Sequence, residues 1–263
     1  MAGSPSDSSL PSSAEPLPLF GTRIYRYDVI TSTQDRAREW IEKGAEPGTV
    51  VTARAMTAGR GRLGRVWHAP ASANLNLTAI GPPVPPDSLW QIPLVMGRAV
   101  ADAIRDVLPE QRVGLRFPND IVFLGRKVAG ILVETAVSPR SGDRLPMIGI
   151  GINVRSASLP PEIAERAIAL EEIGGAVTVE AVERATLERM TRCWSEWQQE
   201  GVEEMLINYH AYLDPTARRN FVVDGRNLPC RLVRVFANGA VVIETEEGVQ
   251  RAFHAAQVVP GDD

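Results

Sequence analysis

The sequence predicts an α+β protein in which helices pack on a mixed β-sheet and a smaller β-structure follows. Two observations lead to this prediction. Segments that alternate apolar and polar residues, as strands do, are interspersed with long stretches whose apolar residues recur at helical spacing. Beyond residue 219 the pattern changes to short strands and turns, and Asn238-Gly239 between alternating segments is a strong hairpin signal.

The first part of the chain supplies the elements of the mixed sheet. Strands are expected over residues 22–29, 49–55, 75–79, 113–117, 121–124, 128–135 and 147–154. A short helix follows the first strand, capped by Ser32 or Thr33, with Ala37, Trp40 and Ile41 on one face and Gly44 at its end. Further helices are expected over residues 89–107, 179–200 and 202–212, with Trp194 and Trp197 packed in the core or at an interface.

The end of the chain predicts a separate small domain. Strands are expected over residues 220–223, 228–236, 240–245 and 249–253, with turns at Asn238-Gly239 and Glu247-Gly248. This pattern indicates a small SH3-like β-barrel beginning near Thr216. We therefore expect a disordered Ser/Pro-rich tail over residues 1–20, a main domain over 21–216 and an SH3-like domain over 217–263.

Composition excludes several classes of protein. The chain has 263 residues, of which 44% are hydrophobic, and a mean hydropathy of −0.08, so it is long enough for one or two soluble domains. No apolar run approaches the ~20 residues that a membrane helix needs. A net charge of −4 and a pI near 5.6 argue against general nucleic-acid binding.

The remaining compositional features make the cytoplasm the expected location. The first 20 residues contain no Lys or Arg and cannot form a secretory signal. Cys193 and Cys230 stand 37 positions apart, which indicates neither a disulfide framework nor a zinc site. The three histidines have no metal-ligand spacing, and we expect them on the surface.

The segment from Gly59 to Arg65 is the most informative part of the sequence. It holds three glycines and three arginines in seven residues, and no Asp or Glu occurs between residues 49 and 86. Glycine lets the backbone approach a ligand closely, and arginine offers planar donors to carboxylate or phosphate. This arginine loop therefore predicts an anion site.

The glycines of this loop match G-x-G-x-x-G, the motif of dinucleotide-binding folds, and with Val66 they match G-x-G-x-x-G-x-V, the glycine loop of protein kinases. The residues that follow the loop exclude the first interpretation, and the rest of the chain excludes the second. A dinucleotide-binding fold needs a helix directly after the glycines, but Pro70 and a proline cluster at residues 82–86 follow here. A protein kinase needs His-Arg-Asp and Asp-Phe-Gly, and neither occurs.

Four further segments accompany the arginine loop. They are Ser32-Thr33-Gln34, the run Arg116-Phe117-Pro118-Asn119-Asp120, the strand Lys-Val-Ala-Gly-Ile-Leu-Val-Glu at 127–134, and Gly-Ile-Gly-Ile-Asn-Val at 149–154. Taken singly, each has a plain structural interpretation: a helix cap, a turn, a strand with a surface lysine, and a tightly packed strand. In this order and spacing, from about residue 20 to the C-terminus, they resemble the biotin protein ligase family, whose members attach biotin to carboxylase carrier domains.

The resemblance implies a fold and a reaction. The main domain would be a catalytic biotin- and ATP-binding domain of class II synthetase-like fold, followed by the SH3-like domain. It implies ATP and Mg²⁺ as cofactors, biotin as substrate and the biotin carboxyl carrier domain of acetyl-CoA carboxylase as partner. Biotin's carboxylate would attack the α-phosphate of ATP to give biotinyl-5′-AMP, and a carrier lysine would then take the biotinyl group. Bringing two anions together needs positive donors, which the resemblance places at Arg60, Arg62 and Lys127 as catalytic residues.

The resemblance also assigns ligand contacts residue by residue. Biotin binding falls to Ser32, Thr33, Gln34, Met56, Arg60, Gly61, Arg62, Lys127 and Gly130. Nucleotide binding falls to Arg62, Arg65, Trp67, Arg116, Asn119, Lys127 and Asn153, and Asp120 is the candidate metal ligand.

The chain departs from the family pattern at four positions. Met56 stands where family members usually have Gln, three residues before the first loop glycine, so biotin's ureido group would lose a side-chain partner. Arg116-Phe117 replaces a common Lys-Trp and keeps both the charge and the aromatic ring. Gln34 replaces a common Asn.

Three other functions compete with biotin ligation. A lipoate or octanoate ligase of related fold also acylates a carrier lysine, but the three-arginine loop and the barrel-like tail favour biotin. A non-enzymatic biotin sensor is supported only by Met56. A repressor would carry a helix-turn-helix module of about 60 residues before the catalytic domain, whereas about twenty Ser/Pro-rich residues stand here, so no operator binding is predicted. The sequence leaves open whether the protein is a monomer or a homodimer.

Overall fold

The computed structural model describes residues 19–214, 218–223, 226–254 and 259–260. The expected tail lies outside these residues except for its last two positions. Phe20 is 1% exposed and its ring packs edge-on against Trp194, so the packed domain begins at or before this residue rather than at residue 21. The expected boundary at Thr216 also lies outside the described residues.

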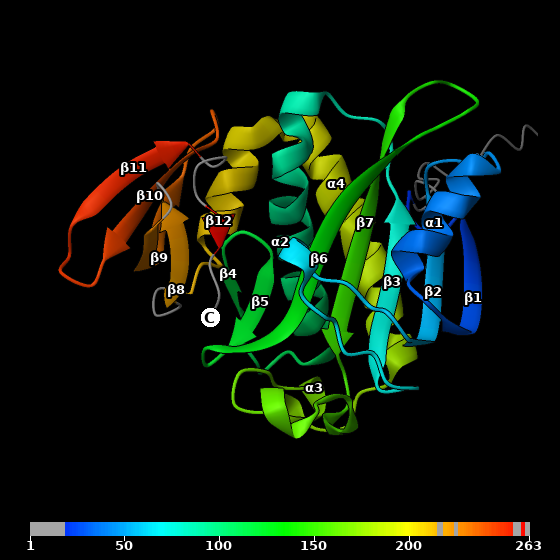
Figure 1. Cartoon of the computed structure of the whole chain (residues 1–263), viewed down its shortest axis with the longest axis horizontal. Helices are drawn as coiled ribbons and strands as arrows, with labels where there is room; N and C mark the ends of the chain where they lie inside the picture. The colour runs from blue at the N-terminus through cyan, green and yellow to red at the C-terminus, as the bar shows by residue number, and fades with distance from the viewer. Residues whose placement is uncertain (1–18, 215–217, 224–225, 255–258, 261–263) are drawn as a thin grey trace, which may run out of the picture.

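A seven-stranded mixed sheet forms the main domain, in the order β1-β2-β3-β7-β6-β5-β4 (Figure 1). Strands β1 and β2 are parallel, and the other neighbours are antiparallel. The strands are β1 (Arg23–Ile30), β2 (Thr49–Met56), β3 (Asn74–Ile80), β4 (Gly114–Arg116), β5 (Asp120–Phe123), β6 (Arg126–Val137) and β7 (Arg144–Asn153).

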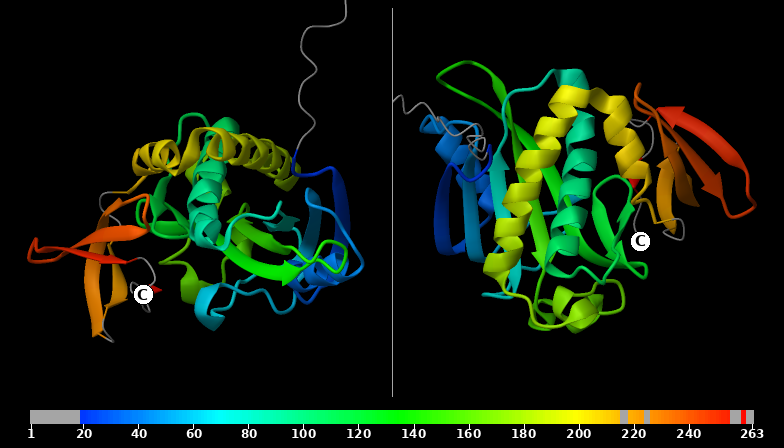
Figure 2. Two further views of the ribbon diagram at one scale, coloured as in Figure 1. Left: turned by 90° about the horizontal axis from the view of Figure 1, so that it is seen from above. Right: turned by 180° about the vertical axis from the view of Figure 1, so that it is seen from behind.

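Two long helices cover one face of this sheet, as Figure 2 shows. They are α2 (Ile92–Val107) and α4 (Val179–His210), which pack side by side over the core. Helix α2 has a proline in its first turn, where no intrahelical amide donor is needed, and it ends just before Pro109. Trp194 and Trp197 of α4 are buried, as predicted. Gly201, with φ of 87°, breaks α4 at the point where the sequence predicts two helices.

The opposite face carries the shorter elements. Helix α1 (Thr33–Glu42) packs on β2, β3, β6 and β7 and buries Ala37 and Ile41, and the arginine loop lies beside it (Figure 2). Gly44 follows it with φ of 83°, as the capping prediction requires. The short helix α3 (Leu170–Gly174) follows β7, and 3₁₀ turns lie at Arg62–Gly64, Pro86–Gln91, Ser156–Ser158 and Pro161–Ile163.

In the main domain, one expected helix starts later than predicted, and one expected strand is buried on both faces. The helix expected from residue 89 starts at Ile92, because the chain before it forms a 3₁₀ turn after Pro85. Strand β3 alternates apolar and polar residues as predicted, but all of its residues are buried, so its polar face meets other protein rather than water. A buried polar face must find hydrogen-bond partners within the protein.

The C-terminal part forms a curled five-stranded antiparallel sheet in the order β11-β10-β9-β8-β12 (Figure 1). Its strands are β8 (Arg218–Val223), β9 (Arg226–Val235), β10 (Ala240–Thr245), β11 (Gln250–His254) and β12 (Val259–Pro260). Gly239 and Gly248 both have φ of 78°, which confirms the two predicted turns. His210, expected on the surface, is instead half-buried at the end of α4, where its Nε2 accepts a hydrogen bond from the amide of Val235 at 3.0 Å.

Candidate active site

A cavity of about 680 Å³ lies between the arginine loop, the first turn of α1 and the strands of the main sheet. Its lining combines residues from β2, β3, β5, β6 and β7 with the loop and the first turn of α1. All fifteen site residues expected from the sequence line it: Ser32, Thr33, Gln34, Met56, Arg60, Gly61, Arg62, Arg65, Trp67, Arg116, Asn119, Asp120, Lys127, Gly130 and Asn153.

The first turn of α1 forms one end of the cavity. Ser32 caps the helix, its Oγ accepting from the amide of Gln34 at 3.2 Å. The Gln34 side chain is buried and donates through Nε2 to the carbonyls of Leu132 at 3.0 Å and Met147 at 3.4 Å. Its Oε1 is buried and accepts no hydrogen bond from the described part of the chain. A buried acceptor of this kind is suited to a ligand's N–H group.

Met56, at the end of β2, lies against the same turn. Its sulfur accepts from the amide of Thr33 at 3.3 Å and lies 3.7 Å from the Thr33 hydroxyl. The thioether is a weak acceptor. It therefore serves as a partner of α1 and, toward the cavity, presents an apolar wall.

The arginine loop is a closed turn, tied to itself by backbone hydrogen bonds. The amide of Gly61 donates to the carbonyl of Arg65 at 2.7 Å, and that of Trp67 donates to Gly59 at 2.9 Å. Gly64 has φ of 76°, which favours glycine at the tip of the turn. Val66 is exposed, whereas Trp67 turns inward.

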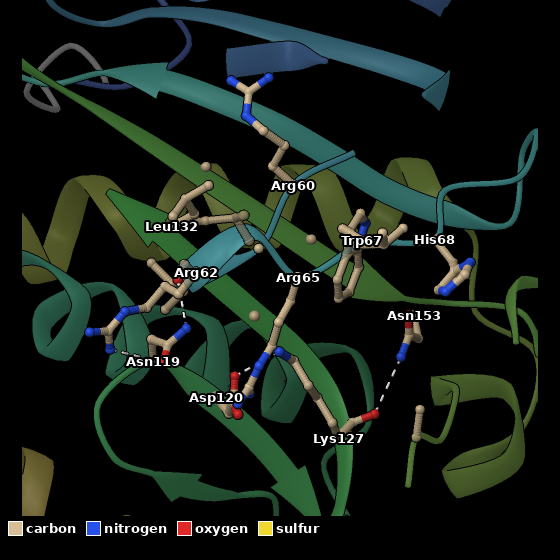
Figure 3. Close-up of a pocket in the computed structure, with 18 of the residues that line it drawn as sticks. Arg60, Arg62, Arg65, Trp67, His68, Asn119, Asp120, Lys127, Leu132 and Asn153 are labelled. Atoms are coloured by element: carbon tan, nitrogen blue, oxygen red, sulfur yellow. Dashed lines mark hydrogen bonds and ion pairs between the residues drawn. The ribbon is translucent and has the colours of Figure 1, made fainter. Parts of the chain in front are cut away.

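The three loop arginines point in different directions (Figure 3). Arg62 donates to Oδ1 of Asn119 at 3.5 Å, and Arg65 extends toward Asp120 and Lys127. Arg60 turns away from Lys127, and its Nη2 lies 2.7 Å from Oδ1 of Asp35 on α1. This hydrogen bond lowers the pKa of Asp35 and raises that of Arg60. The guanidinium of Arg60 thus anchors the loop to α1 in this structure, instead of facing the lysine.

A second cationic group lies on the floor of the cavity. Residues 117–119 join β4 to β5 and place Arg116 opposite Asp120, whose Oδ2 accepts from Arg116 at 3.1 Å. Lys127 at the start of β6 brings its Nζ to 2.7 Å from Oδ1 of Asp120. Gly130 leaves room for this ammonium, because a Cβ there would lie 2.9 Å from the Lys127 Nζ.

Two asparagines tie the neighbouring backbone together. Asn119 donates from Nδ2 to the carbonyl of Ile131 at 2.9 Å. Asn153, at the end of β7, donates to the carbonyls of Lys127 at 3.3 Å and Ile168 at 3.4 Å (Figure 3). The strand that carries Lys127 is thereby fixed on both sides.

Sequence reasoning missed part of the lining. His68 and four residues of the segment 163–167 border the cavity without belonging to any of the motifs. The segment reaches the site because the amide of Lys127 donates to the carbonyl of Arg166 at 2.7 Å. No local pattern marks such a contact between residues far apart in the sequence.

The arrangement defines the class of protein. A pocket with an apolar, amide-bearing end and a strongly cationic end suits a small molecule that carries a carboxylate, held next to phosphate groups. Activation of a carboxylate by a nucleotide is the chemistry that such a site can perform.

Comparisons with known proteins identify the family. The sequence pattern of the biotin/lipoate A/B protein ligase family matches residues 27–153. The bifunctional ligase/repressor BirA of Bacillus spizizenii is 29% identical over 247 residues, covering 90% of this chain and 74% of that protein. The biotin–[acetyl-CoA-carboxylase] ligase of Mycobacterium tuberculosis is 34% identical over 163 residues, covering 59% of this chain and 58% of that protein.

A solved structure extends the match over the whole fold. The biotin protein ligase of Aquifex aeolicus, in complex with biotin and ATP, superposes with a TM-score of 0.75 at 28% identity, covering 92% of this chain and all of that one. The chain belongs to the biotin protein ligase family.

Proposed function

We propose that this protein is an ATP-dependent biotin protein ligase that works in two steps. In the first, a carboxylate oxygen of biotin attacks the α-phosphorus of ATP, the bond to the pyrophosphate breaks, and biotinyl-5′-AMP forms. In the second, a carrier lysine amine attacks the acyl carbon, the bond from carbon to the AMP oxygen breaks, and the amine loses a proton. The product is an amide-linked biotin.

The observation that carries the proposal is the cationic end of the cavity, where Lys127 and Arg116 share Asp120 beneath Arg62 and Arg65. Two anions must meet in the first step, and these side chains offset their repulsion. They also stabilise charge that builds on the phosphorus oxygens. The proposed catalytic residues are Lys127 and Arg62, with Arg60 acting from its pair with Asp35.

The amide-bearing end supplies the biotin contacts in this proposal. The free acceptor Oε1 of Gln34 would take a ureido N–H, and Ser32, Thr33 and Met56 would border the bicyclic ring. Trp67, Asn119 and Asn153 would contact the nucleotide. The closed arginine loop would keep water from the mixed anhydride between the two steps.

The described residues do not form a dedicated magnesium site. No three His, Cys, Asp or Glu side chains gather in the part of the chain that the structure describes. Both oxygens of Asp120 already face cations, so its contacts suit the positioning of Lys127 better than the predicted role as a metal ligand. Mg²⁺ retains water and phosphate ligands readily, and it would enter with the ATP phosphates.

The proposed partner is the biotin carboxyl carrier domain of acetyl-CoA carboxylase, and the proposed location is the cytoplasm. No described helix has the length and hydropathy to span a membrane. A gel-shift assay tests the predicted absence of operator binding, and light scattering distinguishes a monomer from a homodimer.

The lipoate alternative is not favoured, because the Mycobacterium tuberculosis relative and the Aquifex aeolicus structure described above are both biotin ligases. Pyrophosphate release measured with ATP plus biotin, lipoate or octanoate tests the choice directly. Mass spectrometry of an apo-carrier domain, with its target lysine replaced by arginine as control, tests the second step. Pyrophosphate release with lipoate but not with biotin contradicts the proposal. Biotin binding without pyrophosphate release favours the non-enzymatic biotin sensor.

A further inference from the structure

The polar residues of β3 form a buried row beneath the cavity. Asn74, Asn76 and Thr78 alternate with apolar residues, so their side chains leave the same face of the strand. Each is at most 1% exposed. Buried amides and hydroxyls persist in a fold only where they have partners, and each of these three has one in a segment of the site.

The three partners belong to different parts of the cavity wall. Asn74 donates to the carbonyl of His68 at 2.8 Å, just past the arginine loop. Asn76 accepts from the indole N–H of Trp67 at 2.9 Å. Thr78 donates to the hydroxyl of Thr33 at 2.9 Å, on the first turn of α1.

The orientation of the Asn76 amide is determined by its second contact. Its Nδ2 donates to the carbonyl of Ala53 at 3.3 Å, and a carbonyl can only accept. The amide NH₂ must therefore face β2, which leaves Oδ1 to face Trp67. The indole nitrogen can only donate, so the two contacts agree.

Gly151 on β7 fixes the ring from its other side. A Cβ at this position would collide with the indole of Trp67, so the ring lies directly on the glycine backbone. The Lys127 ammonium lies 5.8 Å from the ring centroid, within cation–π range. Trp67 is thus held between the strand backbone and Lys127, with Asn76 setting its rotation.

We propose that Asn76 is a positioning residue for Trp67 and that, through this one hydrogen bond, it sets the protein's affinity for ATP. The inference rests on the proposed function, in which Trp67 borders the nucleotide. Loss of the Asn76 acceptor leaves the indole N–H of the half-buried Trp67 without its protein partner, and the ring then rotates to find one. The biotin end of the cavity, held by α1, keeps its geometry.

The test compares Asn76→Leu with the parent and with Thr52→Val. Thr52 donates to the backbone carbonyl of Asn76 at 3.1 Å, so its replacement removes a buried hydrogen bond from the same strand pair without touching Trp67. We expect Asn76→Leu to raise KM for ATP about tenfold, the effect of a donor that loses its hydrogen-bond partner. KM for biotin should stay within about twofold of the parent value, and Thr52→Val should leave both constants unchanged.

A double-mutant cycle with Trp67→Phe separates positioning from a general structural effect. Phenylalanine has no N–H to orient, so Asn76→Leu should add less than about twofold to KM for ATP in that background. An equal effect in both backgrounds overturns the proposal, as does an unchanged KM for ATP in the single variant. If Asn76→Leu does not fold, Gly151→Ala decides: displacement of the ring should raise KM for ATP, and a parental value overturns the proposal.

The parent protein provides the reference for both claims. Absence of pyrophosphate release from the parent with biotin and ATP contradicts the proposed function itself. If the parent releases pyrophosphate but Asn76→Leu has the same effect with and without Trp67→Phe, the proposed function stands and only the role of Asn76 is rejected.

Discussion

The ammonium of Lys127 lies 2.7 Å from Oδ1 of Asp120, a carboxylate that is buried at the floor of the cavity. The other oxygen of the same carboxylate accepts from Arg116. One buried negative charge on β5 therefore holds two positive groups, one from the strand on each side of it. Burial of a lone charge is costly, and this grouping keeps both cations at the phosphate end without leaving Asp120 uncompensated.

Replacement of Lys127 should nearly abolish the first step. Lys127→Met keeps the length of the side chain and removes its charge, so the charge that builds on the phosphorus oxygens loses a preorganised donor. We expect biotin-dependent pyrophosphate release to fall by about 10²–10³-fold. Lysine occurs at only two positions in the chain, and Lys43→Met is the matched control with parental activity. Activity of Lys127→Met within about threefold of the parent contradicts the charge argument.

The pair between Arg60 and Asp35 should affect retention of the intermediate more than stability. Its side chains are 38% and 39% exposed, and such pairs stabilise a fold by less than about 1 kcal/mol. Because the pair ties the arginine loop to α1, Asp35→Asn should speed the loss of biotinyl-AMP about two- to fivefold. The measurement is release of labelled intermediate in the absence of carrier.

A matched control uses another acidic residue paired with arginine. Asp28 lies 3.6 Å from Arg54 and is far more exposed, so Asp28→Asn should leave retention unchanged. Added salt should bring the rate of biotinyl-AMP loss from the parent closer to that from Asp35→Asn, because salt screens exposed ion pairs. Equal retention by parent and Asp35→Asn at low salt shows that the pair does not hold the loop.

Local patterns predicted most of the fold. The cap at Ser32, the glycine after α1 and the two hairpin turns at Gly239 and Gly248 are all where residue preferences placed them. Helical and strand periodicity located the elements because each is a repeat over a few residues. Periodicity does not show which polar face is buried, and for this reason the role of Asn76 was not predictable from its strand.

The site was predicted as a set of residues but not as a set of contacts. Motif order identified the fifteen residues that share the cavity, since each motif carries its own chemistry. It gave no sign that Arg60 would pair with Asp35, 25 positions earlier, or that Arg166 would meet Lys127. Those contacts depend on how the sheet and loops come together, which no short stretch of sequence encodes.

The substitution at Met56 should weaken biotin binding, and its reversal should restore it. Met56 directs its sulfur at the amide and hydroxyl of Thr33, so it offers the ureido ring no strong hydrogen bond. Met56→Gln would supply one, and we expect the Kd for biotin to fall about two- to tenfold, the gain typical of one net hydrogen bond. Isothermal titration measures this. Met56→Leu, similar in volume and without polar groups, should bind biotin as the parent does; tighter binding by both variants would point to packing instead.

Acidification should weaken the junction between α4 and the C-terminal sheet. Nε2 of His210 accepts a hydrogen bond from the amide of Val235, which requires a neutral imidazole ring. The pKa of His210 is lowered, first by burial of the ring and second by the positive charge of Arg234. The unfolded chain then binds this proton more readily than the folded one. Stability from this group is therefore complete above the unfolded value of about pH 6.5 and is lost as pH falls through the folded pKa.

Thermal unfolding at about pH 7.5 and about pH 5 measures this loss. His210→Gln keeps an acceptor for Val235 and cannot be protonated, so its unfolding temperature should decline less on acidification than that of the parent. Other groups that titrate in this interval affect both proteins alike and cancel in the comparison. The control His68→Gln, at an exposed histidine, should follow the parental decline. Identical declines for the parent and His210→Gln would mean that the hydrogen bond between His210 and Val235 does not contribute to the pH dependence of folding.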